Sequence, residues 1–130
     1  MTPMLGIATV VIDCRDPHRL ARFWAEALGY QPSKGVEDWD DLRSEAEAGE
    51  LEWVRLTGAG VAVAFQRVPE PKAVKNRVHL DLQSTDEESE ASRLAALGAT
   101  RLRRSEDPDD VFGVLADPEG NEFCVVRVEA

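Results

Sequence analysis

The chain carries one local pattern twice, and this internal repeat sets the narrowest limits on its fold. With an offset of 70 residues, Thr9 aligns with His79 and Asp16 aligns with Asp86. In each copy a strand-like run ends in Asp, and the helical pattern that follows stops on Leu-Gly. A period of this length is too long for a solenoid unit, so it predicts two copies of one supersecondary module packed as a pair. The His is present in one copy only, which makes His79 the first functional candidate.

Size and composition are those of an ordinary globular protein. A length of 130 residues suits one domain, and 43% hydrophobic with 31% charged residues is typical of a chain that folds alone. The sequence has 15 Lys and Arg against 25 Asp and Glu, and the resulting net charge of −10 repels nucleic acid and anionic membrane surfaces. We therefore expect neither of these as a partner.

The absence of sorting signals predicts the cellular location. The N-terminus has no basic region followed by an apolar core, and no apolar run approaches membrane-spanning length. These features predict a cytoplasmic protein. Cys14 and Cys124 are then expected to be free thiols, because cytosolic thiols stay reduced.

The expected elements repeat the order strand, helix and two or three further strands. Asp16 is predicted to cap a helix that has Pro17 at its first position and ends at Gly29. A Gly-Ala-Gly turn at residues 58–60 predicts a hairpin, and two prolines within residues 69–76 predict a linker. We expect helices at residues 17–28 and 87–97, weak helical character at 42–49, and strands at 5–13, 50–57, 61–68, 77–83, 99–103, 111–116 and 122–128. This order predicts an α+β fold.

Three groups of residues resemble one known superfamily. They are the paired strand-Asp-helix openings, the segment Phe65-Gln-Arg-Val-Pro-Glu-Pro-Lys72 with Asn76-Arg-Val-His-Leu-Asp-Leu82, and Asp117-Pro-Glu-Gly-Asn-Glu-Phe-Cys124. The sequence resembles the vicinal oxygen chelate superfamily of glyoxalase I, bleomycin-resistance proteins and extradiol dioxygenases, and most closely its small glyoxalase-like proteins. The resemblance covers nearly the whole chain.

The resemblance implies the glyoxalase/bleomycin resistance/dihydroxybiphenyl dioxygenase fold, in which two βαβββ modules form a cupped mixed sheet. We expect a single domain over residues 1–130, with module 1 at about 4–68, a linker at 69–76 and module 2 at 77–130. The resemblance also implies a homodimer.

In the metal enzymes of this superfamily, a His on the first strand and a Glu on the last strand of each module hold a divalent ion. Carried over to this chain, the two His positions hold Thr9 and His79, and the two Glu positions hold Gln66 and Cys124. Only His79 keeps the metal-binding residue type. The resemblance therefore favours no bound metal, because one imidazole with a hydroxyl and an amide is a poor ligand set.

A rearranged metal site is the alternative. Asp81 and Glu122 each lie two residues from a family site position, so each shares a strand face with it. His79, Asp81 and Glu122, with or without Cys124, would then hold zinc, iron, nickel or manganese. His79 and Glu122 are also the catalytic candidates, as an acid/base pair.

Each candidate also has a structural interpretation. His79 fits a structural histidine bonded to Asp81 as well as a ligand contact, and Cys124 fits a small buried hydrophobe better than a nucleophile. Trp39 fits a ring folded onto the core or part of a lid over a pocket.

The function predicted from these residues is binding of a small organic ligand. The candidate ligand-binding residues share their expected position on the inner strand faces or on a covering loop, and they are Thr9, Gln66, His79, Asp81, Cys124 and Trp39. Sequestration of the resistance type is one form of such binding. The alternatives are a lyase, isomerase or dioxygenase with the rearranged site, and an interaction module.

Overall fold

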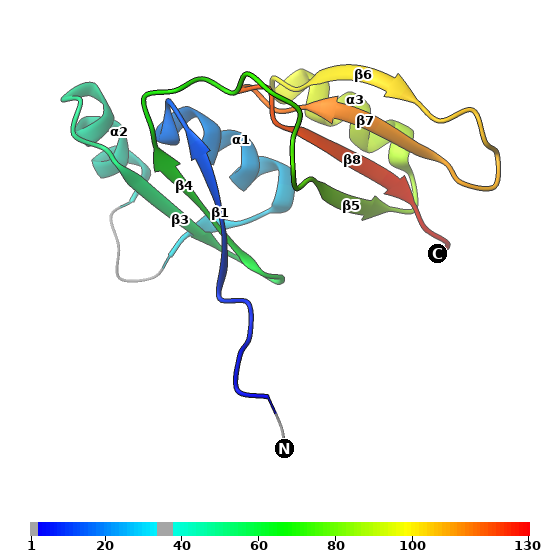
Figure 1. Ribbon diagram of the computed structural model, residues 1–130, viewed down its shortest axis with the longest axis horizontal. Coiled ribbons are helices and arrows are strands. Elements are labelled where there is room, and N and C mark those ends of the chain that lie inside the picture. The colour runs from blue at the N-terminus through cyan, green and yellow to red at the C-terminus, as the bar shows by residue number, and fades with distance from the viewer. Residues whose placement is uncertain (1–2, 34–37) are drawn as a thin grey trace. The chain divides into compact units, whose positions relative to one another are not determined.

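The computed structural model of this chain divides into two compact units, Met1–Pro71 and Lys72–Ala130, and describes residues 3–33 and 38–130. Each unit contains a four-stranded sheet (Figure 1). The α+β class and the two βαβββ modules are thus confirmed, with one additional helix in unit 1. Among the described residues, no helix is both long and apolar enough to cross a membrane.

Unit 1 has the sheet order β1-β4-β3-β2. The chain runs through β1 (Thr9–Cys14), α1 (Pro17–Leu28), β2 (Gln31–Pro32), α2 (Trp39–Glu47), β3 (Trp53–Thr57) and β4 (Ala62–Arg67). β1 pairs with β4 in parallel, and the other neighbours are antiparallel. α1 packs on β3 and β4, and the largest fully buried side chains of this core are Trp24, Phe65, Leu20 and Leu56.

Unit 2 has the corresponding sheet order β5-β8-β7-β6. The chain runs through β5 (Leu80–Ser84), α3 (Glu87–Leu97), β6 (Thr100–Arg104), β7 (Phe112–Ala116) and β8 (Glu122–Arg127). β5 pairs with β8 in parallel, as β1 pairs with β4 in unit 1. α3 packs on one face of this sheet, against Phe123, Val125 and Leu115.

Local sequence signals set the helix boundaries. The Asp16 carboxylate accepts a hydrogen bond from the Arg19 amide at 3.1 Å, and Gly29 ends α1 with φ of 70°. Asp86 caps α3 in the same way, through the Ser89 amide at 3.1 Å. α2 begins three residues earlier than expected, because Asp38 caps it through the Asp41 amide.

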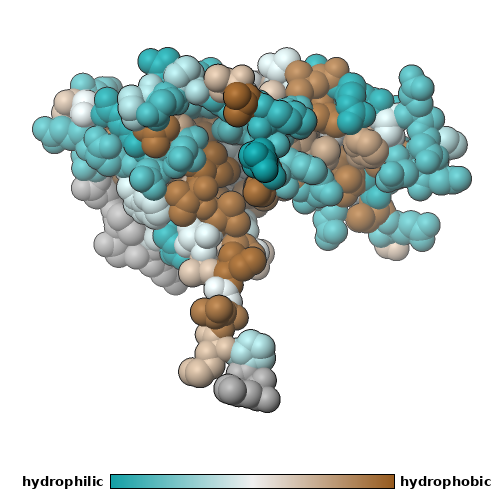
Figure 2. All heavy atoms as spheres, viewed as in Figure 1, coloured by the Kyte–Doolittle hydropathy of each residue, from teal (hydrophilic) through white to brown (hydrophobic). Residues whose placement is uncertain are grey.

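Three strands begin at least three residues later than the sequence predicts, because pairing rather than propensity sets their first residues. β1 begins at Thr9, which is opposite Ala62, the first residue of β4. Residues 5–8 are therefore not in a strand, and the same holds for residues 50–52 and 77–79. Figure 2 shows hydrophobic residues along the segment before β1 and along β1 itself, and Met4 and Leu5 are each 97% exposed.

The last hairpin of each unit, β3–β4 in unit 1 and β7–β8 in unit 2, closes by a different means. In unit 1 the buried Tyr30 hydroxyl donates to the Val61 carbonyl and accepts from the Gly60 amide, both at 3.0 Å. A Cβ on Gly58 would lie 2.1 Å from the Tyr30 ring, so this turn requires glycine. In unit 2 the buried Asp117 carboxylate accepts from the backbone amides of Glu119 and Asn121, at 2.9 and 3.0 Å. A phenol in one turn and a carboxylate in the other thus satisfy the turn amides.

Candidate functional site

The candidate residues of unit 2 lie on the sheet face that α3 does not cover, here called the helix-free face of unit 2. Side chains alternate along a strand, so Phe123 and Val125 point to α3 while Cys124 points the other way. Asp81 is opposite Cys124 in the parallel pair, and Val114 is opposite it on β7. The three adjacent strands β5, β8 and β7 thus bring one acid, one thiol and one apolar side chain together.

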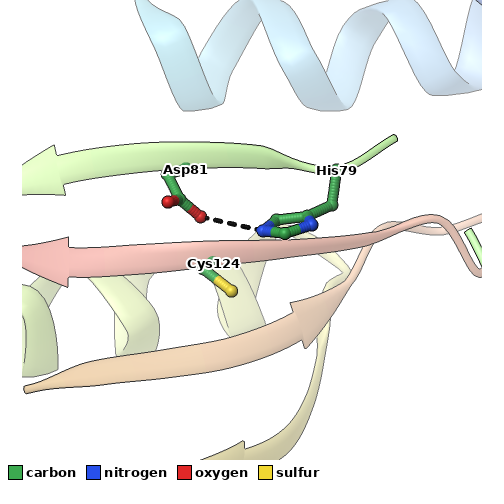
Figure 3. Close-up of side chains that lie close together, drawn as sticks. All are labelled: His79, Asp81 and Cys124. Atoms are coloured by element: carbon green, nitrogen blue, oxygen red, sulfur yellow. Dashed lines mark hydrogen bonds and ion pairs between the residues drawn. The ribbon is translucent and has the colours of Figure 1, made fainter. Parts of the chain in front are cut away.

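His79, Asp81 and Cys124 form a compact polar group on this face (Figure 3). The His79 Nε2 atom lies 3.1 Å from Asp81 Oδ1, and one ligand atom from each residue lies within 4.8 Å of the other two. The His79 and Asp81 side chains are about half exposed, and Cys124 is less so. The group is therefore accessible within its unit and can exchange its internal hydrogen bond for one to a ligand.

The environment of Cys124 raises the pKa of its thiol. Burial is the largest cause, and the negative charge of Asp81 and a hydrogen bond with its carboxylate act in the same direction. Arg103 opposes them with a smaller effect. The thiol is therefore protonated at neutral pH, which argues against a nucleophilic cysteine.

Glu122 is not part of this group. Its carboxylate lies 3.0 Å from the Lys75 ammonium and 4.0 Å from that of Lys72. The hydrogen bond from Lys75 is the main reason that the pKa of Glu122 lies below its usual range. A general acid needs a raised pKa, so this environment does not suit Glu122 for that role.

In unit 1 the corresponding helix-free face is dominated by Arg55, which sequence reasoning missed as a site residue. The Arg55 Nε atom donates to the Thr9 hydroxyl at 3.0 Å, and Nη1 donates to the Ser33 hydroxyl at 3.2 Å. Trp53 lies two residues before Arg55 and is opposite Gln66. The signal that could have found Arg55 is its position between the core residues Val54 and Leu56, which turns it to the face of Thr9.

Two further candidates are Gln66 and Trp39. Gln66 is exposed near the end of β4, opposite Asp13 and Trp53, on the same helix-free face of unit 1 as Arg55. Trp39 is the first residue of α2, and its ring lies on α1, 6.0 Å from the His18 ring and 4.7 Å from the Arg22 guanidinium. The ring therefore lies on a polar helix surface rather than in the hydrophobic core. Residues 34–37, which come before Trp39 in the sequence, are outside the described residues.

The match to a family model decides the family. Residues 9–126 match the model described as glyoxalase-like domain. The chain belongs to the glyoxalase-like domain family. This confirms the resemblance to the vicinal oxygen chelate superfamily, and no curated protein matches the chain.

Solved structures of other glyoxalase-like proteins share the fold. An enzyme of the glyoxalase/bleomycin resistance protein/dioxygenase family from Burkholderia phytofirmans is 18% identical with a TM-score of 0.71, over 95% of this chain and 99% of that chain. A fosfomycin resistance protein from Listeria monocytogenes, complexed with Mn(II) and 1S,2S-dihydroxypropylphosphonic acid, is 10% identical with a TM-score of 0.71, over 95% and 90%. A bleomycin-binding protein from Streptomyces verticillus, complexed with copper(II)-bleomycin, is 17% identical with a TM-score of 0.61, over 99% and 100%. At these identities the likeness shows the fold alone.

The residues of this glyoxalase-like chain do not fit the metal set of the superfamily's metal enzymes. At the first position, Thr9 already accepts a hydrogen bond from a permanently charged guanidinium, which disfavours a cation there. The positions that the resemblance assigns to carboxylates hold Cys124 and Gln66, and Glu122 is paired with lysines. The rearranged group of His79, Asp81 and Cys124 offers nitrogen, oxygen and sulfur ligands, a combination that fits zinc better than magnesium or manganese.

Proposed function

We propose that this glyoxalase-like protein binds small organic ligands on the helix-free face of each unit and needs no resident metal to do so. The observation that carries the proposal is the hydrogen bond that the Arg55 guanidinium donates to the Thr9 hydroxyl, at 3.0 Å. A fixed cation at this position suits a polar or anionic group of a ligand and opposes a metal ion.

The side chains around Arg55 support a binding surface of mixed character. Trp53 and Val11 share this face and are each 44% exposed. Small-molecule sites combine apolar walls with a few fixed polar groups, and an exposed indole adds a surface for stacking. The ligand that fits is a compact molecule with an apolar or aromatic body and hydrogen-bonding substituents.

The His79 and Asp81 pair in unit 2 supplies a second set of hydrogen-bonding groups. The imidazole can donate or accept according to its tautomer, while the carboxylate accepts. The bleomycin-binding protein of this fold supports sequestration as the form that such binding takes.

The test uses untagged protein purified without chelator. Elemental analysis measures bound metal, and thermal shift measures stabilisation by a panel of small aromatic compounds with copper(II)-bleomycin as the first probe. We expect no stoichiometric metal and a saturable shift with at least one compound, which Arg55→Met and His79→Ala weaken without changing the circular dichroism spectrum. The matched control is Arg93→Gln, which removes an exposed charge on α3. Stoichiometric metal in the wild type that is lost in His79→Ala would overturn the metal-free proposal.

The second candidate function is a metal-dependent lyase, isomerase or dioxygenase. The convergence of His79, Asp81 and Cys124 within 4.8 Å favours it, because three ligands with an open position are typical of catalytic zinc sites. Zinc retained by the wild type and lost on Asp81→Asn would establish this site, and activity assays would follow.

We also infer that the protein acts as a homodimer. The segment before β1 exposes Met4, Leu5 and Ile7, and a cluster of exposed apolar side chains is typical of an interaction surface. Light scattering at micromolar concentration measures the mass, and a monomer would contradict the inference.

A further inference from the structure

Unit 1 contains a cavity of about 480 Å³ outside the helix-free face, and three of its lining residues are arginines. We propose that this cavity binds the carboxylate or phosphate group of a small anionic molecule. The arginines are Arg15, Arg43 and Arg67, and the carboxylates in the lining are Asp16 and Glu47. The proposal does not rest on the proposed function, because none of these residues belongs to the helix-free faces.

The parallel pairing of β1 and β4 brings two of the arginines together. Parallel strands end at the same sheet edge, and Cys14 at the end of β1 is opposite Arg67 at the end of β4. Arg15 follows Cys14 directly, and α1 begins two residues later. α2 contributes Arg43 to the same cavity. The crevice outside the carboxyl ends of parallel strands is where open α/β sheets bind ligands.

In unit 2, the arginine equivalent to Arg67 binds a carboxylate. The Val68 amide donates to the Cys14 carbonyl at 2.7 Å, and the Val128 amide donates to the Ser84 carbonyl at 2.9 Å. The two bonds make Arg67 and Arg127 equivalent, each at the end of its strand. Arg127 binds the carboxylate of Glu87, which Arg104 also contacts at 3.0 Å.

The first residue of the helix explains the difference between the units. Glu87 is the first residue of α3 and is only 2% exposed, so unit 2 holds a carboxylate beside its strand-end arginine. Pro17 is the first residue of α1, carries no charge and lines the cavity. The cavity of unit 1 thus lies where unit 2 holds an anion of its own.

The contacts of Arg67 and Arg43 leave capacity for a ligand. Arg67 donates through Nη1 to the Gly49 carbonyl at 2.9 Å, and within the described part of the chain its other guanidinium nitrogens have no hydrogen bond. Its Glu52 partner is at 3.7 Å and mostly exposed. Arg43 pairs with Asp40 three residues away, also at the surface. Such exposed pairs are weak, so an anion in the cavity can replace them.

Charge and size define the ligand class. The Asp16 carboxylate accepts the Arg19 amide as the cap of α1. The pKa of His18, which lines the cavity, is lowered mainly by burial, so its ring is uncharged at neutral pH. A volume of about 480 Å³ suits a small molecule rather than a peptide or nucleic acid, and Leu51 and Ala46 give it an apolar wall. We therefore expect a small organic anion with a carboxylate or phosphate group.

The test is a titration with sodium phosphate and sodium acetate at constant ionic strength, followed by the NMR signals of the arginine Nε–H groups. Sodium chloride is the reference titration for non-specific charge screening. We expect saturable shifts of the Arg67 signal with phosphate or acetate and not with chloride. Tryptophan fluorescence is a second readout, because the Trp39 ring contacts His18 of the lining.

Two variants and one control separate a site from general attraction. Arg67→Gln is expected to weaken anion binding about tenfold, because it removes a charge-assisted hydrogen bond. Pro17→Glu places a carboxylate where unit 2 has Glu87 and is expected to abolish binding. Arg93→Gln makes the same charge change on α3 and should leave binding unchanged. Absence of saturable shifts in the folded wild type, or equal binding by wild type and Arg67→Gln, would overturn the proposal. Neither result would bear on the proposed function, which is tested separately by the thermal shift of the wild type and of Arg55→Met.

Discussion

The two units share one plan but differ at the sheet edge where the first helix begins. Both have a parallel strand pair, an Asp helix cap and an arginine at the end of the last strand. In unit 2 the arginine is bound by Glu87, a buried carboxylate of its own unit. In unit 1 the matching position is Pro17, beside a cavity. One copy of a repeated module thus uses a charge for stability, and the other leaves the charge for a ligand.

On the helix-free faces the roles are exchanged, because there the polar residue of unit 1 makes the structural contacts and that of unit 2 does not. In unit 1, Arg55 bonds to Thr9 and to Ser33, which are 46 and 22 residues away in the sequence. In unit 2, His79 bonds to Asp81, two residues away. The arginine therefore ties strands together, while the histidine pair is local. A residue that holds strands together should affect stability, and a local exposed pair should affect binding alone.

The largest expected effect is on the ion cluster of unit 2. Glu87→Ala removes the buried carboxylate and leaves Arg104 and Arg127 without their shared partner. We expect the free energy of unfolding to fall by about 3 kcal/mol, which urea denaturation measures. The control is Glu88→Ala, whose pair with Arg101 is exposed and should therefore contribute much less to stability. Equal losses for the two variants would show that the buried carboxylate has no special role.

A smaller effect is expected at Arg55. Arg55→Met removes hydrogen bonds to Thr9 and Ser33, and the expected loss is about 1–2 kcal/mol of unfolding free energy. His79→Ala removes one exposed contact and should change stability by less than about 0.5 kcal/mol. Denaturant unfolding of both variants tests the contrast between the two faces. A larger loss of unfolding free energy for His79→Ala than for Arg55→Met would contradict this contrast.

Local signals made much of the fold predictable from the sequence. Asp16, Pro17 and Gly29 set the ends of α1, because a cap, a fixed φ and a left-handed residue act within one turn of chain. The repeat of this pattern at Asp86 and Gly98 gave the second module. Strand starts were less predictable, since the first residue of β1 depends on its partner in β4.

The candidate site was predictable only where neighbours in sequence are neighbours in space. Alternation along a strand placed His79 and Asp81 on one face, where the structure has them hydrogen bonded. The contact of Arg55 with Thr9 joins strands far apart in the chain, and no local pattern reports it. The ion pair between Glu122 and Lys75 could not be predicted from the sequence for the same reason. Lys75 is distant in sequence and lies in a segment with no regular structure.

The smallest expected effect concerns the Cys124 thiol and separates two contributions to its pKa. The pKa is raised, so the thiolate fraction at neutral pH is low. The rate of alkylation by iodoacetamide should therefore keep rising with pH until the pH is above the usual pKa range of a thiol. Asp81→Asn removes a negative charge and should lower the pKa, which makes alkylation a few-fold faster at mildly alkaline pH. The pKa should stay above normal even so, because burial is the larger cause.

Peptide mass spectrometry measures the rate at Cys124, with Cys14 as the internal reference. Cys14 is 2% exposed and should remain unmodified while the protein is folded. An identical pH dependence in wild type and Asp81→Asn would mean that the carboxylate does not influence the thiol. A faster reaction in the variant would show that Asp81 acts electrostatically on the Cys124 thiol. Asp81 and Cys124 would then respond together to a bound ligand or metal ion, unlike Arg55 on the helix-free face of unit 1.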